Sequence, residues 1–251
     1  MISKNLIKLI KSLEQKKYRK REKLFVAEGP KVVGDLMTLM APHLIIATSD
    51  WYNEQHVAAD VVANEDEMHR ISFLQHPQGV MALFRLPELE DLPQDQLLNN
   101  LTLALDDVQD PGNLGTIIRL ADWFGIEHIL CNQGTADAYS PKVVQASMGS
   151  IARVRLHYTD LAEYLKKLHD IVPVYGTFLD GSNLYAEELS SSGIIIMGNE
   201  GNGISNSVER HVTKRLLIPS YPAERPTAES LNVAIATAIT CAEFRRMNYK
   251  K

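Results

Sequence analysis

The sequence lacks long hydrophobic runs. No apolar run approaches the roughly 20 residues that a membrane-spanning helix needs. The first 17 residues, MISKNLIKLIKSLEQKK, also lack the uninterrupted apolar segment and the small-residue cleavage site of a secretory signal. We therefore expect a cytoplasmic protein without a transmembrane segment.

Metal-binding and redox motifs are also missing. The two cysteines, Cys131 and Cys241, lie far apart and form no Cys-x-x-Cys pair, and the eight histidines are scattered along the chain. This spacing favours buried apolar packing of both cysteines over a redox or metal role. The sequence therefore predicts no metal site.

Neither of the common phosphate-binding fingerprints occurs. Residues 107–119, DVQDPGNLGTIIR, follow an apolar run and lead into an amphipathic one, which is typical of a strand, a glycine turn and a helix start. However, Gly112 and Gly115 belong neither to Gly-x-Gly-x-x-Gly nor to a Walker loop that ends in Lys-Ser/Thr. A dinucleotide-dependent oxidoreductase is disfavoured because it would need such a fingerprint.

What the sequence does have is enough apolar residues for a core and an uneven distribution of charge. With 251 residues, of which 45% are hydrophobic, it can form one large domain or two small ones. Residues 1–23 contain nine basic and two acidic residues, a net charge of +7, whereas the rest of the chain has 17 basic and 29 acidic residues. This basic end indicates either a foothold for a polyanion or a solvated helix face.

The hydrophobic pattern predicts a small α/β unit at the N-terminus. Its expected strands are 24–29, 43–49, 60–64 and 79–86, and its expected helices are 30–40, a short one near Asp50, and 64–74. Residues 86–100 are rich in Pro, Asp, Glu and Asn, which is typical of a linker. We place a first domain at 1–86, a linker at 87–97 and a second domain at 98–251.

The second domain is also expected to be α/β. Its strands are uniformly apolar and each is followed by a helical pattern, which indicates a parallel sheet with helices on both faces. The expected strands are 101–106, 127–131, 154–158, 172–178, 193–198 and 215–220; the expected helices are 113–124, 140–153, 160–170, a short one from Ile204, and 227–247.

Ligands of parallel sheets bind beyond the carboxyl ends of the strands, so the loops that follow strands are the candidate sites. The first such loop, 107–119, carries the polar Asn113 and, among apolar neighbours, Arg119. An arginine in such a setting pairs with a structural carboxylate or contacts a substrate, and the local sequence leaves both open. The second loop, IIIMGNEGNGIS at 194–205, has three glycines around Glu200, which indicates close approach of the backbone to a ligand.

The third candidate is residues 216–239, LLIPSYPAERPTAESLNVAIATAI. Ser230 and Asn232 interrupt an otherwise apolar, small-residue helix, where polar side chains need hydrogen-bond partners. Either Thr227 or Ser230 caps this helix, or the polar residues serve a function. The alanine-rich body of this helix predicts close packing against another element or subunit.

In this order, the three stretches resemble the three motifs of the SpoU (TrmH-like) family of RNA ribose 2'-O-methyltransferases, in the SPOUT superfamily. Residues 113–119 are similar to the first motif, 198–204 to the second, and Ile218-Pro219 with 230–233 to the third. The resemblance covers about 98–251. Residues 8–33 and 76–84 also resemble the small substrate-binding domain that precedes the catalytic domain in many members.

The resemblance implies a C-terminal SPOUT domain with a trefoil knot, preceded by a small α/β substrate-binding domain. It also implies S-adenosyl-L-methionine as the methyl donor, no metal, RNA as the substrate, and a homodimer whose active site combines both subunits. Ribosomal RNA is favoured over transfer RNA because the N-terminal domain is common among such members. A tRNA 2'-O-methyltransferase and a non-catalytic RNA-binding or ribosome-assembly protein remain alternatives.

Carried over position by position, the resemblance assigns the site residues. The family's cofactor contacts fall on Gly198, Ile218 and Leu231. Its catalytic or RNA-facing residues fall on Asn113, Arg119, Glu200, Ser230 and Asn232. The sequence departs from the family pattern at 220–229, SYPAERPTAE, where a shorter connection that contains glycine is usual.

Overall fold

The chain forms two compact units in the computed structural model, which describes residues 2–55, 58–88, 92, 94–168, 171–222 and 228–249. Unit 1 comprises Met1–Glu88 and Asp137–Arg153, and unit 2 comprises Leu89–Ala136 and Val154–Lys251. In the described part of the chain, no helix is long and apolar enough to cross a membrane.

Unit 1 contains a four-stranded sheet in the order β1-β4-β2-β3, in which only β2 and β3 pair in parallel. Helices α1 and α5 pack on one face, where Ile10 and Met68 join the core, while α3 and α8 pack against β1 and its neighbours. The strands are β1 (Leu24–Glu28), β2 (Pro42–Thr48), β3 (Val61–Ala63) and β4 (Val80–Arg85); the helices are α1 (Lys4–Ser12), α2 (Lys16–Glu22), α3 (Pro30–Met37), α4 (Ser49–Gln55), α5 (Glu65–Ile71), α8 (Pro141–Ser147) and the 3-10 turn η1 (Ser150–Ala152).

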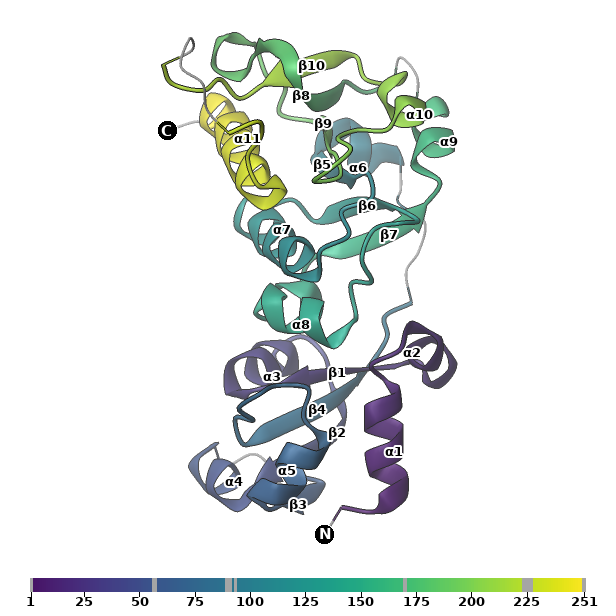
Figure 1. The fold of residues 1–251 in the computed structure, drawn as a ribbon, viewed down its shortest axis with the longest axis vertical. Helices are drawn as coiled ribbons and strands as arrows, with labels where there is room; N and C mark the ends of the chain where they lie inside the picture. The colour runs from purple at the N-terminus through teal and green to yellow at the C-terminus, as the bar shows by residue number, and fades with distance from the viewer. Residues whose placement is uncertain are drawn as a thin grey trace. The chain divides into compact units, whose positions relative to one another are not determined.

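Unit 2 contains a six-stranded sheet in the order β10-β8-β9-β5-β6-β7, and every neighbouring pair is parallel, as the sequence predicts (Figure 1). Its strands are β5 (Leu101–Leu105), β6 (His128–Asn132), β7 (Arg155–Thr159), β8 (Val174–Asn183), β9 (Gly193–Met197) and β10 (Lys214–Leu217). Its helices are α6 (Gln94–Asn99), α7 (Pro111–Trp123), α9 (Leu161–Lys166), α10 (Asn206–Glu209), α11 (Val233–Asn248) and the 3-10 turn η2 (Leu184–Ala186).

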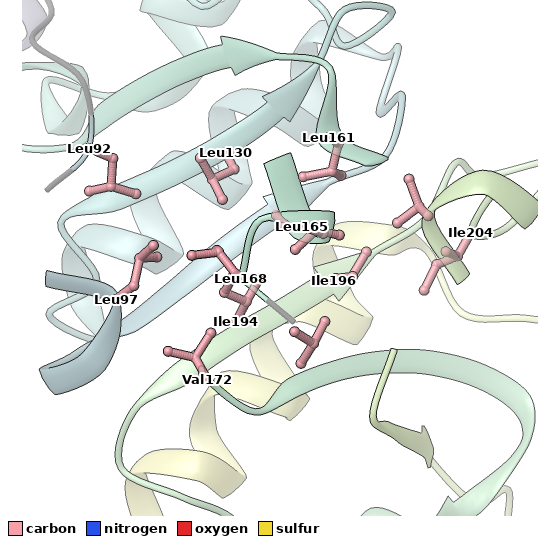
Figure 2. Close-up of a cluster of buried hydrophobic side chains, with 13 residues drawn as sticks. Leu92, Leu97, Leu130, Leu161, Leu165, Leu168, Val172, Ile194, Ile196 and Ile204 are labelled. Atoms are coloured by element: carbon pink, nitrogen blue, oxygen red, sulfur yellow. The ribbon is translucent and has the colours of Figure 1, made fainter. Parts of the chain in front are cut away.

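Helices cover both faces of this sheet, which confirms the predicted α/β arrangement with a parallel sheet. On one face, side chains of α6, α9 and α10 pack with those of the central strands into one apolar cluster that contains Leu97, Leu165 and Ile196 (Figure 2). On the other face α7 packs against α11, and the ring of Phe244 in α11 meets Tyr175 of β8 edge to face at 4.8 Å. Burial of both faces explains why the strands read as uninterrupted apolar runs.

Several predicted helices have other ends in the structure. The helix expected at 140–153 ends at Ser147, because Met148 and Gly149 adopt left-handed backbone angles, φ 50° and 90°. A side chain at Gly149 would bring its Cβ to 2.5 Å from the Cβ of Asp35, so glycine is required there. The helix expected from Ile204 begins at Asn206, and the helix expected at 227–247 begins only at Val233.

The segment expected to be a linker contributes to the core of unit 2. Residues 94–99 form α6, and Leu92 and Leu97 are buried in the cluster of Figure 2. The polar residues Asp95, Asn99 and Asn100, on either side of Leu97, are exposed. Both cysteines, Cys131 and Cys241, are free and buried, and burial raises the pKa of the Cys241 thiol to about 12, so the thiol stays protonated.

Because all six strands of unit 2 run in parallel, their carboxyl ends lie at one edge of the sheet. The loop after β5 leads to α7, the loop after β9 carries Glu200, and the loop after β10 begins at Ile218. All three candidate loops therefore lie at the same edge of the sheet.

Candidate functional site

The side-chain amide of Asn113 connects the three candidate loops. Its Nδ2 donates a hydrogen bond to Oε1 of Glu200 at 2.9 Å. Its Oδ1 accepts a hydrogen bond from Nδ2 of Asn232 at 3.0 Å. Since an amide has both a donor and an acceptor, one asparagine can satisfy a carboxylate on one side and a second amide on the other. Residues from all three sequence motifs therefore meet in one cluster.

Asn113 is held at the start of α7 by local sequence. Asp110 is the N-cap residue, and its Oδ1 accepts a hydrogen bond from the Asn113 backbone N–H at 2.8 Å. Pro111 occupies the first helical position, where the absence of an N–H costs nothing. The helix consequently begins two residues earlier than expected, and Asn113 projects from its first turn.

Glu200 is positioned by a tight loop that closes on Asn199. The backbones of Asn199 and Gly203 exchange two hydrogen bonds of 2.9 Å, and Gly203 adopts a left-handed φ of 67°. The Oδ1 of Asn199 accepts from the N–H groups of Gly201 and Asn202, at 2.9 and 3.1 Å. Its Nδ2 donates to the carbonyl oxygen of Asp107 at 2.8 Å. Asn199 thus fastens the second loop to the first.

A second fastening comes from the buried carboxylate of Asp106, which directly follows β5. One oxygen accepts the backbone N–H of Ser205 at 2.7 Å, and the other accepts Nδ2 of Asn132 at 2.9 Å. The next residue, Asp107, has a positive φ of 59° and accepts the N–H of Gly134 at 3.0 Å. The site assignments from sequence missed Asp106, Asp107 and Asn199. For Asp106 and Asp107, the available signal was a pair of acidic residues directly after a buried strand.

Asn232 is the N-cap of α11 and does not interrupt the helix. Its Oδ1 accepts from the N–H groups of Ala234 and Ile235 at 3.0 and 3.3 Å, which leaves its Nδ2 for Asn113. Asparagine favours this position because its side chain competes with the helical backbone for hydrogen bonds. Ser230 therefore lies outside the helix, where it is exposed.

Arg119 is exposed, contrary to the impression given by its apolar sequence neighbours. Leu114, Ile117 and Ile118 occupy the buried face of α7, and Arg119 lies on the other side. Within the residues that the structure describes, its guanidinium makes no hydrogen bond or ion pair with a protein group. A structural carboxylate is therefore not its partner there. Arg119 is six residues, or about 9 Å, along the helix from Asn113.

The three residues assigned to the cofactor lie at the ends of elements on the same edge of the sheet. Gly198 directly follows β9 and Ile218 directly follows β10, whereas Leu231 precedes the cap of α11. A side chain at Gly198 would place its Cβ 2.3 Å from the carbonyl carbon of Gly203, so the loop closes only with glycine at 198. Residues 223–227, within the divergent connection, lie outside the described residues.

The border of the second loop combines exposed backbone with apolar side chains. The loop presents backbone around Gly201 and Gly203, and a Cβ added at Gly203 would meet no atom within 4 Å. Ile218 is half-buried, and Leu231 exposes 50% of its surface although it is apolar. In the described part of the chain, no group of three His, Cys, Asp or Glu side chains is placed to hold a metal.

The close approach at Gly198 yields a prediction. Replacement of Gly198 by alanine forces the 198–203 loop apart and should lower the free energy of unfolding by about 1–3 kcal/mol, as overpacked sites do. Gly201→Ala is the matched control, because its Cβ would meet only Oδ1 of Asn199, at 3.6 Å. Chemical denaturation measures both variants. Equal stability of the two would contradict this account of the loop.

Comparison with known proteins finds a matching family for each of the two parts of the chain. The SpoU rRNA Methylase family matches residues 100–242, and the MRM3-like substrate binding domain matches residues 4–82. The chain is 33% identical over 246 residues to the 23S rRNA (guanosine(2553)-2'-O)-methyltransferase RlmP of Bacillus subtilis, and the match covers 94% of each protein.

Solved structures give the same picture. A TrmH-family protein from Porphyromonas gingivalis is 44% identical, with a TM-score of 0.86 and coverage of 98% of this chain and 99% of that chain. An AdoMet-bound rRNA methyltransferase from Sinorhizobium meliloti is 29% identical, with a TM-score of 0.82 and coverage of 100% and 97%. The chain belongs to the SpoU rRNA methylase family.

Proposed function

We propose that this protein transfers the methyl group of S-adenosyl-L-methionine to a ribose 2'-hydroxyl of ribosomal RNA. The observation that carries the proposal is the hydrogen-bonded cluster of Asn113, Glu200 and Asn232, which joins residues of all three family motifs. The relative from Bacillus subtilis, which matches nearly the full length of the chain, is named as a 23S rRNA 2'-O-methyltransferase.

Gly198, Ile218 and Leu231 would hold the cofactor, through backbone groups of the second loop and apolar side chains at its border. The AdoMet-bound state of the Sinorhizobium meliloti neighbour supports this cofactor. When bound, S-adenosylmethionine supplies an electrophilic methyl group. No metal is part of the proposal, since the reaction needs none.

Arg119 is proposed to bind an RNA phosphate and to orient the acceptor hydroxyl. Its exposed guanidinium has no protein partner among the described residues, so its donors are available for a bidentate phosphate contact. A guanidinium does not release its proton at neutral pH and is a poor general base. We therefore assign most of the rate to placement of the hydroxyl, since orientation alone contributes roughly 7–11 kcal/mol in well-ordered intramolecular reactions. In this transfer the ribose oxygen would gain the methyl group as the bond between sulfur and methyl breaks, the hydroxyl proton would pass to water, and S-adenosylhomocysteine would leave.

Asn113, Glu200 and Asn232 are proposed to keep the loops in register and to face the ribose. Ser230, exposed just before the α11 cap, is proposed to contact the RNA as well. Looped or single-stranded RNA is the favoured target, because a ribose inside a helix is hard to bring to a pocket.

The active enzyme is proposed to be a homodimer with a trefoil knot in unit 2, located in the cytoplasm. The exposed apolar residues Trp123 of α7 and Ile235 of α11, at 84% and 52% exposure, support a subunit contact along these two helices. The similarity to TrmH-family structures supports the knot.

The basic N-terminus is proposed to capture RNA. Lys16, Lys17 and Lys20 are exposed on α2, where they can neutralise phosphates. The N-terminal match to the MRM3-like substrate binding domain supports this assignment. Deletion of residues 1–23 would not test it, because Ile10 and Leu13 belong to the core of unit 1.

The test is methyl transfer from labelled S-adenosylmethionine to purified ribosomal and transfer RNA in separate reactions. We expect label in ribosomal RNA and none in transfer RNA. Label in transfer RNA alone would show that transfer RNA, and not ribosomal RNA, is the substrate. A protein that binds the cofactor and RNA yet labels neither would be the non-catalytic alternative and would contradict the proposed activity.

The role of Arg119 predicts that Arg119→Lys lowers kcat about 100-fold, because lysine keeps the charge but loses the planar fork that orients the substrate. Cofactor binding should not change. Arg155→Lys is the control, since Arg155 begins β7 at the opposite edge of the sheet. This variant should retain full activity. The measurement is single-turnover methyl transfer. A rate for Arg119→Lys within twofold of the unmodified protein would contradict the orienting role.

A further inference from the structure

The guanidinium of Arg19 is buried in unit 1, although its neighbours in α2 are exposed. Lys16, Lys17 and Lys20 lie on one side of the helix, as residues three and four apart do. Arg19 points inward and is only 3% exposed. Lys17 Nζ and the Arg21 guanidinium each lie 4.8 Å from the ring centroid of Tyr18. α2 thus separates one buried cation from a row of exposed ones.

Arg19 fixes α2 to the end of α1. Its Nη1 donates to the carbonyl oxygens of Leu13, the C-cap residue of α1, and of Glu14 in the turn that follows, at 2.7 and 2.6 Å. A cation at a helix C-terminus is also favoured by the helix dipole. The turn between the two helices is therefore closed by one side chain.

The charge of Arg19 is balanced by Asp137, which is distant in sequence. Nη2 of Arg19 lies 3.0 Å from Oδ2 of Asp137, and the other carboxylate oxygen accepts the Tyr139 backbone N–H at 2.9 Å. The Tyr139 ring packs on Phe25 of β1 with the centroids 5.0 Å apart. Asp137 is accordingly held by its own turn and presents a fixed carboxylate to Arg19.

We infer that Asp137 is a positioning residue for RNA capture: through Arg19 it holds α2 so that Lys16, Lys17 and Lys20 face the RNA together. The inference rests on the proposed RNA-binding function. Loss of the carboxylate leaves a buried, uncompensated guanidinium, which can regain hydration only if α2 leaves its place. The lysines would then no longer act as one preorganised surface.

The test compares full-length Asp137→Asn with the unmodified protein, with 23S ribosomal RNA transcribed in vitro as the probe. We expect RNA affinity to fall about tenfold, and the salt slope to decrease by about one unit for each phosphate that the protein no longer neutralises. KM for RNA should rise with kcat unchanged. The direction of the change in RNA affinity is informative, because removal of a negative charge would by itself strengthen binding to a polyanion.

Asp35→Asn is the matched control. It removes the same charge from unit 1 but only an exposed ion pair with Lys31, which contributes little. Its RNA affinity should equal or exceed that of the unmodified protein. S-adenosylmethionine binding and thermal unfolding verify that each variant is folded. If Asp137→Asn does not fold, Asp137→Glu replaces it, with a smaller loss of affinity expected.

A second background separates positioning from general stability. Substitution of Lys16, Lys17 and Lys20 by glutamine should itself weaken RNA binding, and addition of Asp137→Asn should then cause no further loss. Equal losses from Asp137→Asn in both backgrounds, or unchanged affinity of the folded single variant, would overturn the inference. If the triple lysine variant binds RNA normally while the enzyme methylates it, RNA capture by α2 is wrong although the activity stands.

Discussion

The amide of Asn113 joins the loop after β5, the loop after β9 and the cap of α11. Its two hydrogen bonds, to Glu200 and from Asn232, are possible only if the three backbones are already close and correctly oriented. Asp106 and Asn199 hold the first two of these loops together, since each bonds a backbone group of the other loop. The third is brought close by the packing of α11 against α7. The cluster is exposed to solvent, so its hydrogen bonds contribute chiefly to geometry and less to stability.

Two residues of this cluster, Asn113 and Asn232, also take part in helix capping. Asp110 caps α7, so that Asn113 lies in the first turn. Asn232 caps α11 with its side-chain oxygen, while its side-chain Nδ2 donates to Asn113. Local helix-capping preferences and the long-range cluster therefore favour the same conformation, which is the condition for a well-defined site. The parallel sheet adds the larger constraint, because it brings the ends of β5, β9 and β10 to one edge.

Periodicity predicts the parallel sheet of unit 2 and the helices on both of its faces, because strands buried on both sides appear as apolar runs. It does not predict the ends of elements that depend on tertiary contacts. Met148 and Gly149 end α8 next to Asp35, and Asn232 starts α11, a function that alternation of residue types does not reveal. The exposure of Arg119 was also hidden, since the adjacent isoleucines face the opposite side of α7. The family motifs identify the three loops of the site, but the contact between Asn113 and Glu200 appears only in three dimensions.

The central claim is that Glu200 and Asn232 act through the same amide of Asn113. A double-mutant cycle on kcat/KM for ribosomal RNA methylation tests it most directly, with Glu200→Ala and Asn232→Asp. The aspartate keeps the α11 cap but loses the donor to Asn113. If both residues work through Asn113, the double variant should be no slower than the slower single variant, because the cluster is already disrupted. Rate losses that multiply in the double variant would show independent roles and contradict this account.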